Sequence, residues 1–349
     1  MTKVISASGA NSLLPVFAGL DVGAQELVLA LRMDGCPQDG GSFPNSPAGI
    51  RSLVKRLKAL KRPVFACMEA TGVYFLQAAK ALAAAEGISV MVANPRTIKD
   101  FARAMNRRSK TDRVDARVIA LYAQKADFVA WAPASDNHHH LRLISRRIDE
   151  RVRQQAADKN RLHSLRAGGS CPRCVQQDVL ANIKHHQRSI KRMRQAAVAI
   201  IKSEEALLGR YQLMLSIPGV GAATAVRLLA ELCVMPDCLT ARQWTAYAGL
   251  DPVHNESGTS VRTPSRISRA GNSRLRNALF FAAMVACRTD PHVRAFTEKL
   301  VQRGKKKIQA IVAVMRKLLH AIWGMFETNT TFNGVVLFPQ LTPEPLTSQ

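Results

Sequence analysis

The chain has 349 residues, 47% of them hydrophobic, and its 50 Lys and Arg against 25 Asp and Glu give a formal net charge of +25. That length and apolar content suffice for two globular domains and a helical connector. The excess of positive charge indicates a polyphosphate partner such as nucleic acid, although a ribosomal or merely soluble basic protein would also be basic. A membrane partner is disfavoured, because no long uninterrupted apolar segment or amphipathic anchor stands out.

Cysteine usage and the N-terminus bear on the cellular compartment. The seven cysteines are scattered and odd in number, and the first ten residues have no apolar core of signal-peptide length. We therefore expect reduced thiols and a cytoplasmic, nucleoid-associated protein in a bacterium.

Residues 1–134 contain the pattern of an α/β domain. Apolar runs predict strands at 14–20, 26–33, 64–68 and 89–93, with helices at 46–60, at 74–85 and from Asn94 onward. Ser46 before Pro47 is typical of a helix start, and Asp34-Gly35 indicates a hairpin turn. The order of two hairpin strands followed by alternating helices and strands matches an RNase H-like sheet.

Residues 135–205 differ in character, because apolar residues become sparse among Arg, Gln and Lys. A stripe at spacings of three and four predicts two long helices in a coiled-coil hairpin or oligomerising arm. Its members are Ile183, His186, Ile190, Met193, Ala197 and Ile200, with a weaker stripe at Leu141, Ile144 and Ile148. We expect 136–140 to be a solvated linker and 167–174 to form the tip.

Residues 206–330 are apolar again and predict a mostly helical domain. Residues 331–349 are rich in Thr and Pro and are expected to form a flexible tail.

Four acidic residues stand out in this basic chain. Asp21 and Glu69 each follow a predicted buried strand, and Asp112 and Asp115 are three apart, so that a helix would project them from one face. Capping of a helix start accounts for the aspartate pair alone but not for the whole set. Carboxylates at strand ends and on one helix face suit one or two Mg²⁺ ions against a phosphodiester. The neighbouring cations are candidates for phosphate contacts: Lys110, Arg113 and Arg117.

Ile217-Pro-Gly-Val-Gly221 lies between two helical patterns and resembles a helix-hairpin-helix element. Gly219 and Gly221 would let the backbone approach closely, and amides at the start of the second helix can meet a phosphate. Such an element binds the nucleic-acid backbone without reading its sequence. A tight turn between two helices is the alternative.

Serines and arginines alternate between Asn255 and Arg276, in a loop with Gly and Pro before an apolar helix. A hydroxyl beside several guanidinium groups can attack phosphorus, because the cations stabilise the charge of the transition state. From the residues alone, a phosphate-binding loop is favoured over a nucleophilic serine. The candidate phosphate contacts here and downstream are Arg262, Arg266, Arg269, Arg274, Arg276, Lys305, Lys306 and Lys307.

Cys171-Pro-Arg-Cys174 supplies only two possible zinc ligands. His163, His185 or His186 would have to complete a site, so reduced cysteines in a loop are the favoured interpretation.

Seven motifs together resemble one family, the DEDD insertion-sequence transposases related to the Piv/MooV DNA invertases, described as bridge-RNA-guided or seeker-RNA-guided recombinases. The resemblance covers about residues 15–325, in matching order and spacing. The motifs are Gly19-Leu-Asp-Val22, Glu69-Ala-Thr-Gly-Val-Tyr74, Asn94-Pro95, Lys110-Thr-Asp-Arg-Val-Asp-Ala-Arg117, Ile217-Pro-Gly-Val-Gly221, Tyr247-Ala-Gly-Leu-Asp-Pro252 and Glu256-Ser-Gly-Thr-Ser-Val-Arg262.

The resemblance implies a RuvC-like domain of RNase H fold at 1–134, a coiled-coil connector at 135–205 and a transposase domain at 206–330. Matched residue by residue, it assigns Asp21, Glu69, Asp112 and Asp115 to Mg²⁺ and Ser257 to the nucleophile. It implies a 5′-phosphoserine intermediate, donor and target DNA, a structured guide RNA from the element, and a dimer or tetramer. The segment 168–174 has no counterpart in the family pattern.

Two other functions would also fit the residues. In a Mg²⁺-dependent, RuvC-like junction resolvase or nuclease, the acids would hydrolyse DNA and Ser257 would only bind phosphate. In a non-catalytic architectural protein, the hairpin and basic tail would bind nucleic acid, but the four acids would have no role.

Overall fold

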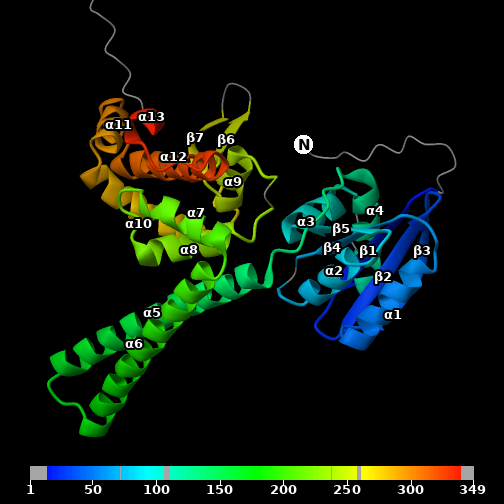
Figure 1. Cartoon of the computed structure of the whole chain (residues 1–349), viewed down its shortest axis with the longest axis horizontal. Coiled ribbons are helices and arrows are strands. Elements are labelled where there is room, and N and C mark those ends of the chain that lie inside the picture. The colour runs from blue at the N-terminus through cyan, green and yellow to red at the C-terminus, as the bar shows by residue number, and fades with distance from the viewer. Residues whose placement is uncertain (1–13, 71, 106–110, 237, 258–260, 339–349) are drawn as a thin grey trace, which may run out of the picture. The chain divides into compact units, whose positions relative to one another are not determined.

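The computed structural model describes residues 14–70, 72–105, 111–236, 238–257 and 261–338, with the backbone alone between 254 and 265. Its contacts divide the chain into two compact units, Met1–Pro133 and Ala134–Gln349 (Figure 1). The first unit is a mixed sheet with helices, and the second is mostly helical. Each unit has its own hydrophobic core.

The first unit is built on a five-stranded sheet of order β3-β2-β1-β4-β5. The first three strands pair antiparallel, whereas β1, β4 and β5 run parallel. The strands are β1 (Val16–Val22), β2 (Glu26–Met33), β3 (Cys36–Pro44), β4 (Val64–Glu69) and β5 (Ile88–Ala93). The helices are α1 (Pro47–Lys58), α2 (Phe75–Ala83), α3 (Pro95–Ala104) and α4 (Asp112–Lys125).

Strand β1 has a different partner on each of its faces, because successive side chains alternate. Val16, Ala18 and Leu20 belong to the core formed with α1 and α2. Phe17 belongs to the opposite core, which includes residues of α3 and α4. Gly19 lies so close to α4 that a Cβ there would overlap the Ala116 carbonyl oxygen and the Ala120 nitrogen.

Strand β3 is the one strand of this sheet that the sequence pattern does not predict. Its sequence, Cys-Pro-Gln-Asp-Gly-Gly-Ser-Phe-Pro, is mostly exposed and has no apolar alternation. Backbone pairing with β2 forms this edge strand, so its side chains carry no burial signal.

The second unit begins with two long helices, α5 (Asp136–Ala167) and α6 (Arg173–Lys202), which lie side by side as a helical hairpin (Figure 1). Ile183, His186, Ile190 and Ala197 of the predicted stripe are buried. The expectation of a solvated linker at 136–140 is wrong, because α5 starts there. The Ser135 hydroxyl accepts from the His138 amide at 3.2 Å, and the His138 ring lies 3.1 Å from Glu204.

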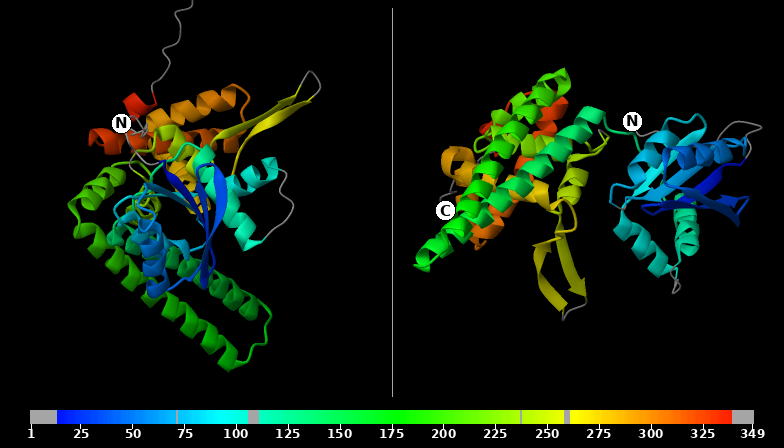
Figure 2. Two further views of the ribbon diagram at one scale, coloured as in Figure 1. Left: turned by 90° about the vertical axis from the view of Figure 1, so that its right-hand side faces the viewer. Right: turned by 90° about the horizontal axis from the view of Figure 1, so that it is seen from below.

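The remaining elements form the helical body of this unit. They are α7 (Glu205–Leu215), α8 (Ala222–Leu232), α9 (Ala241–Ala248), β6 (Pro252–Ser257), β7 (Val261–Ile267), α10 (Ser273–Thr289), α11 (Pro291–Gln302), α12 (Lys307–Thr328) and α13 (Gly334–Leu337). The segment expected as a loop at 255–276 contains the β6–β7 hairpin, which projects from the helices (Figure 2).

Helix α12 is the central helix of the body. By length and composition it is the one helix in the described segments apolar enough to cross a membrane. Its side chains Val314, Leu318, Leu319 and Ile322 are buried in the core of this unit. We therefore interpret α12 as a core helix.

The described part of the predicted flexible tail is packed. Within 331–338, α13 forms a short turn of helix, and Phe338 after it is 1% exposed. The Phe338 ring packs edge-on against Phe296, and the Lys317 ammonium donates to the Leu337 carbonyl at 3.0 Å. The Thr-rich and Pro-rich composition predicted a flexible tail, but the buried Phe338 fixes this part of it.

We predict that Gly19→Ala lowers the free energy of unfolding by about 1–3 kcal/mol, because the new methyl group displaces the α4 backbone. Gly209→Ala is the matched control: its Cβ would meet nothing within 4 Å, in helix α7. That change should raise stability by up to about 1 kcal/mol. Urea denaturation of the full chain measures both, and an unchanged Gly19→Ala variant would contradict the close packing.

Candidate active site and nucleic-acid interface

The sheet places Asp21 and Glu69 at neighbouring strand ends. β1 and β4 are parallel, with Leu20 opposite Met68, so the next residue of each strand is the acidic one. Asp21 has the strand parity of Phe17 and Gly19, and Glu69 that of Cys67. Both residues therefore belong to the face of the sheet on which α4 packs.

Helix α4 brings the other two carboxylates to the same edge. Thr111 caps the helix by accepting from the Val114 amide at 3.3 Å, which starts α4 at Asp112. Asp112 and Asp115 both lie in the first turn, where the unpaired amides favour negative charge. The contact at Gly19 fixes Ala116 and Ala120 against β1, so the start of α4 lies beside the end of that strand.

The pKa of Asp21 records this convergence. Burial, followed by the negative charges of Asp112, Asp115 and Glu69, raises it from 3.8 to about 6. Three carboxylates from a second strand and a helix therefore act on Asp21. A strongly perturbed acid with specific charged neighbours is typical of a functional site.

The donor set is chemically suited to a hard divalent cation, because all four groups are carboxylates. Across the described segments, however, no three His, Cys, Asp or Glu side chains already form a group able to hold a metal. Mg²⁺ usually takes only one or two carboxylates, with water and substrate phosphates as its other ligands. The quartet fits that open arrangement and not a closed protein cage.

The predicted cations around α4 differ in their surroundings. Arg113 is exposed and lies 3.7 Å from the Asp39 carboxylate of β3, and Arg117 is exposed on the same helix. Lys110 lies outside the described residues. Arg113 and Arg117 are therefore accessible to a phosphate backbone.

Ser257 is the last residue of β6, opposite Val261 of β7, at the tip of the described hairpin. Its side chain and that of Arg262 lie outside what the structure describes. The backbone thus places Ser257 at the end of a projecting ribbon in the second unit, whereas the four acids belong to the first unit.

The base of the β6–β7 hairpin is fixed by side-chain and backbone hydrogen bonds. The Ser268 hydroxyl donates to the Asp251 carboxylate at 2.5 Å, and the Arg269 amide donates to the Gly249 carbonyl at 3.1 Å. The Arg276 guanidinium donates to the Ala248 carbonyl at 2.7 Å. Burial, together with the charge of Arg269, lowers the pKa of Arg276. Arg276, predicted as a phosphate contact, therefore holds the hairpin base.

A basic cavity of about 970 Å³ adjoins this base. It brings together Arg266, Arg269 and Lys305, and adds Arg316 and Lys317, which the sequence did not single out. None of the described lining residues is acidic, and Gln309 and His320 are the other polar members. The rest of the wall is apolar and is formed by Leu250, Pro252, Ile267, Phe296, Leu300, Ile308, Val312 and Ala313. Cations over an apolar wall suit a phosphate and the base attached to it.

Lys306 and Lys307 are exposed at the start of α12, beside Lys305. Arg274 is half-buried in the first turn of α10.

The glycines of the predicted helix-hairpin-helix have different roles. Gly219 has φ +88°, and a Cβ there would lie 2.6 Å from the Ala282 carbonyl of α10, so this residue is packed. Gly221 is the exposed N-cap residue of α8, with open space around its Cα. A phosphate can therefore approach Gly221, whereas Gly219 serves the packing of α10.

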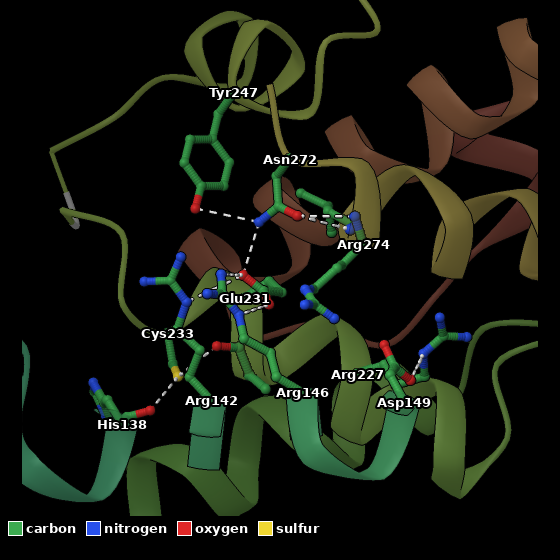
Figure 3. A network of polar contacts seen from close by, with 12 residues as sticks. His138, Arg142, Arg146, Asp149, Arg227, Glu231, Cys233, Tyr247, Asn272 and Arg274 are labelled. Carbon is green, nitrogen blue, oxygen red and sulfur yellow. Dashed lines mark hydrogen bonds and ion pairs between the residues drawn. The ribbon is translucent and has the colours of Figure 1, made fainter. Parts of the chain in front are cut away.

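The second unit contains a buried polar junction that was not predicted from the sequence (Figure 3). Glu231 of α8 is 2% exposed and accepts from Arg146 at 2.8 Å, Arg142 at 3.2 Å and Asn272 at 2.7 Å. Asn272 also caps α10, and its side-chain amide lies 3.3 Å from the Tyr247 hydroxyl. Helices α5, α8 and α10 and the end of α9 thus meet at one carboxylate.

Burial alone would raise the pKa of Glu231, but Arg146, Arg142 and Asn272 outweigh burial and lower it. The carboxylate is therefore ionised and fully paired at neutral pH. An acid within the apolar run Leu228–Leu232 was the available sequence signal, together with Asn272 as a cap residue.

An acidic cluster on a mixed sheet, joined to a basic helical unit, defines the class: an enzyme that acts on nucleic acid. Comparison with known protein families shows which family within that class the chain resembles. The DEDD transposase family of IS110 elements matches residues 18–166, and the family "Transposase IS116/IS110/IS902" matches residues 211–298.

Individual relatives agree with these families. The pilin gene-inverting protein of Moraxella bovis is 32% identical over 296 residues, which are 84% of this chain and 90% of that protein. Its counterpart in Moraxella lacunata is 32% identical over 76% of this chain and 81% of its own length. The IS1111A transposase of Coxiella burnetii is 24% identical over 70% of this chain and 73% of its own length. The chain belongs to the IS110/IS116/IS902 transposase family, whose members are DNA recombinases.

We predict that Asp21→Asn stabilises the metal-free protein at pH 8 by about 1–3 kcal/mol. Because the folded-state pKa of about 6 exceeds the ordinary 3.8, wild-type stability should fall as pH rises between these values. Asn mimics the protonated acid and avoids this loss, so the two proteins should converge near pH 4. Urea denaturation across this range tests the prediction, with the exposed Glu86→Gln as control. A difference that does not depend on pH would contradict it.

We predict that Glu231→Gln lowers the free energy of unfolding by about 2–4 kcal/mol at pH 7, because Arg142 and Arg146 lose their shared counter-charge. The pKa of Glu231 is lowered from 4.5, so its contribution is present above that value and disappears as pH falls through the folded-state pKa. Urea denaturation should show a large difference in the free energy of unfolding between wild type and Glu231→Gln at pH 7. The difference should be small at low pH. Equal stability at pH 7 would refute the role of this junction.

Proposed function

We propose that this transposase is a site-specific recombinase of an insertion sequence. In this proposal Asp21, Glu69, Asp112 and Asp115 hold Mg²⁺ and Ser257 is the nucleophile. The observation that carries it is the placement of Asp21 and Glu69 on adjacent strands beside the first turn of α4, where burial and the charges of the other three carboxylates raise the pKa of Asp21. Mutually repelling acids would not be gathered at one sheet edge without a cation or a phosphate-directed task.

We propose an RNase H-like, RuvC-like fold for the first unit. The strand order β3-β2-β1-β4-β5 and the change from antiparallel to parallel pairing at β1 support it. The position of the acids supports it too, because Asp21 is next to last in the central strand and Glu69 ends its parallel neighbour.

In the proposed reaction the Ser257 hydroxyl oxygen attacks a DNA phosphorus. A serine–phosphorus bond forms, the bond from phosphorus to the 3′ oxygen breaks, and the serine proton passes to solvent while the 3′ oxygen gains a proton. The products are a 5′-phosphoserine link and a free 3′-hydroxyl. Attack by a different 3′-hydroxyl then rejoins the strand and releases the serine, so no external energy source is needed. Bound Mg²⁺ would supply electrostatic stabilisation of charge on the phosphate.

The protein's own cations have a positioning role in this proposal. Arg266, Arg269 and Lys305 around the basic cavity, and the exposed Lys306 and Lys307, would hold phosphates near the serine ribbon. The hydrogen bonds of Asp251 and Gly249 would keep that ribbon's base in place.

We also propose that donor and target DNA are held together with a structured guide RNA from the element. A net charge of +25 suits a protein that neutralises several phosphate backbones at once. The acids and Ser257 lie in separate units. We propose that they act together in a dimer or tetramer, where the acids and the serine of one active site come either from the same chain or from two chains.

The test is recombination between an element junction and its target, with trapping of covalent protein–DNA adducts. Ser257→Ala should abolish both adducts and recombination, by about 10³-fold or more, because the nucleophile is lost. Asp21→Ala should reduce both while leaving DNA binding intact. Ser52→Ala, an exposed serine on α1, is the matched control and should behave as wild type.

The products separate the competing functions. Adducts and recombination by Ser257→Ala would refute the serine assignment. Free 5′-phosphates formed in a metal-dependent reaction would indicate a nuclease or junction resolvase instead. Activity that survives EDTA would contradict the role of Mg²⁺, and nucleic-acid binding without any strand cleavage would indicate an architectural protein.

A further inference from the structure

The tip of the helical hairpin carries two cysteines. Helix α5 ends at Ala167, Gly169 turns the chain with φ +75°, and α6 begins at Arg173. Cys171 lies just before α6 and Cys174 is its second residue. Figure 1 shows this tip at the far end of the arm from α7 and α8, and α5 alone, at 32 residues, spans about 48 Å.

Both thiols at the tip are accessible, unlike the cysteines of the two cores. Cys174 is exposed and Cys171 is half-exposed, and neither is in a disulfide. By contrast, Cys67 and Cys233 are buried, and burial raises the pKa of each thiol to about 12. The core cysteines are packing residues, whereas the tip pair is open to a ligand.

The pair has the composition and spacing of half a zinc site. Two cysteines separated by two residues are the usual unit of structural zinc sites, which need four ligands in a tetrahedron. Pro172 fixes the backbone between a turn and a helix start, so the two thiols leave from a defined segment. Cys174 is exposed at the tip together with Gly168, Gly169 and Ser170, and the Cys171 thiol donates to the carbonyl of the adjacent Pro172 at 3.5 Å.

One chain does not complete the site. In the described segments, no third His, Cys, Asp or Glu joins these thiols as a group able to hold a metal. His163 and His185, the nearest histidines in sequence, are exposed on α5 and α6 and do not form such a group. His186 is committed elsewhere, 3.3 Å from the Asp158 carboxylate inside the hairpin. The missing ligands must come from outside the chain.

We propose that Cys171 and Cys174 bind zinc together with the same two cysteines of a second copy, tip to tip. The tip is the end of the long helical hairpin formed by α5 and α6. Two copies can therefore meet there through their tips alone. Each thiol releases its proton to solvent as its sulfur binds the metal, and nothing is oxidised or reduced. The site is structural, with four thiolates and no open position, and it does not depend on the proposed recombination chemistry.

The test is the metal content and coordination of the full-length protein, loaded with Zn²⁺ and dialysed with excess Mg²⁺. Wild type should retain about one zinc per two chains. Cys171→Ser and Cys174→Ser should each lose it, while Cys36→Ser, an exposed cysteine of the other unit, should keep it. Asp21→Asn should also keep it, which excludes zinc held at the acidic cluster.

Substitution by Co²⁺ identifies the ligands. The inference requires thiolate-to-metal charge-transfer absorption and the intense visible bands of a tetrahedral four-sulfur site, both lost in Cys171→Ser. One metal per chain would overturn it, because a single copy would then complete the site. Zinc retained in the Cys171→Ser variant, no zinc bound by reduced wild type, or a Cys171–Cys174 disulfide in its place would overturn it as well.

Discussion

The contact between β1 and α4 at Gly19 is the constraint on which the acidic site depends. A side chain there would collide with backbone atoms of Ala116 and Ala120, so the helix can lie directly on the strand only because residue 19 has none. This close approach brings the first turn of α4 to the end of β1. Asp112 and Asp115 then act on Asp21 through space, and hydrophobic packing on both faces of the sheet offsets the repulsion.

In the second unit, a network of hydrogen bonds positions the β6–β7 hairpin. Glu231 holds α5 and α10 to α8 with charged hydrogen bonds, and Asn272 of the same junction starts α10. A few residues before Asn272, Ser268 and Arg269 close the base of the β6–β7 hairpin. The buried carboxylate is therefore connected, through one short segment, to the ribbon that ends at Ser257.

The sequence predicted those parts of the fold that depend on burial. Strands such as β1 and β4 are continuous apolar runs, and the cap at Ser46 starts a helix where local chemistry requires. It failed where the backbone or a single long-range contact decides the structure. β3 is polar and is formed by pairing alone, and Phe338 anchors a segment whose composition indicated a tail.

The candidate site shows the same division. Asp21 and Glu69 were predictable because each follows a buried strand, and the helical spacing of Asp112 and Asp115 placed both on one face. The packing role of Gly219 and the use of Arg276 at the Ala248 carbonyl were not predictable, because both depend on segments distant in sequence. Glu231 was overlooked for the same reason, since its partners lie 41 to 89 residues away.

The most direct test of the central claim is an NMR titration of the Asp21 carboxyl carbon in the metal-free full chain, compared between wild type and the double variant Asp112→Asn, Asp115→Asn. We predict a pKa of about 6 in wild type and a clear decrease in the double variant, because two of the three repelling charges are gone. An Asp21 that titrates at its ordinary value, or one unaffected by the double substitution, would show that the four carboxylates do not share one site.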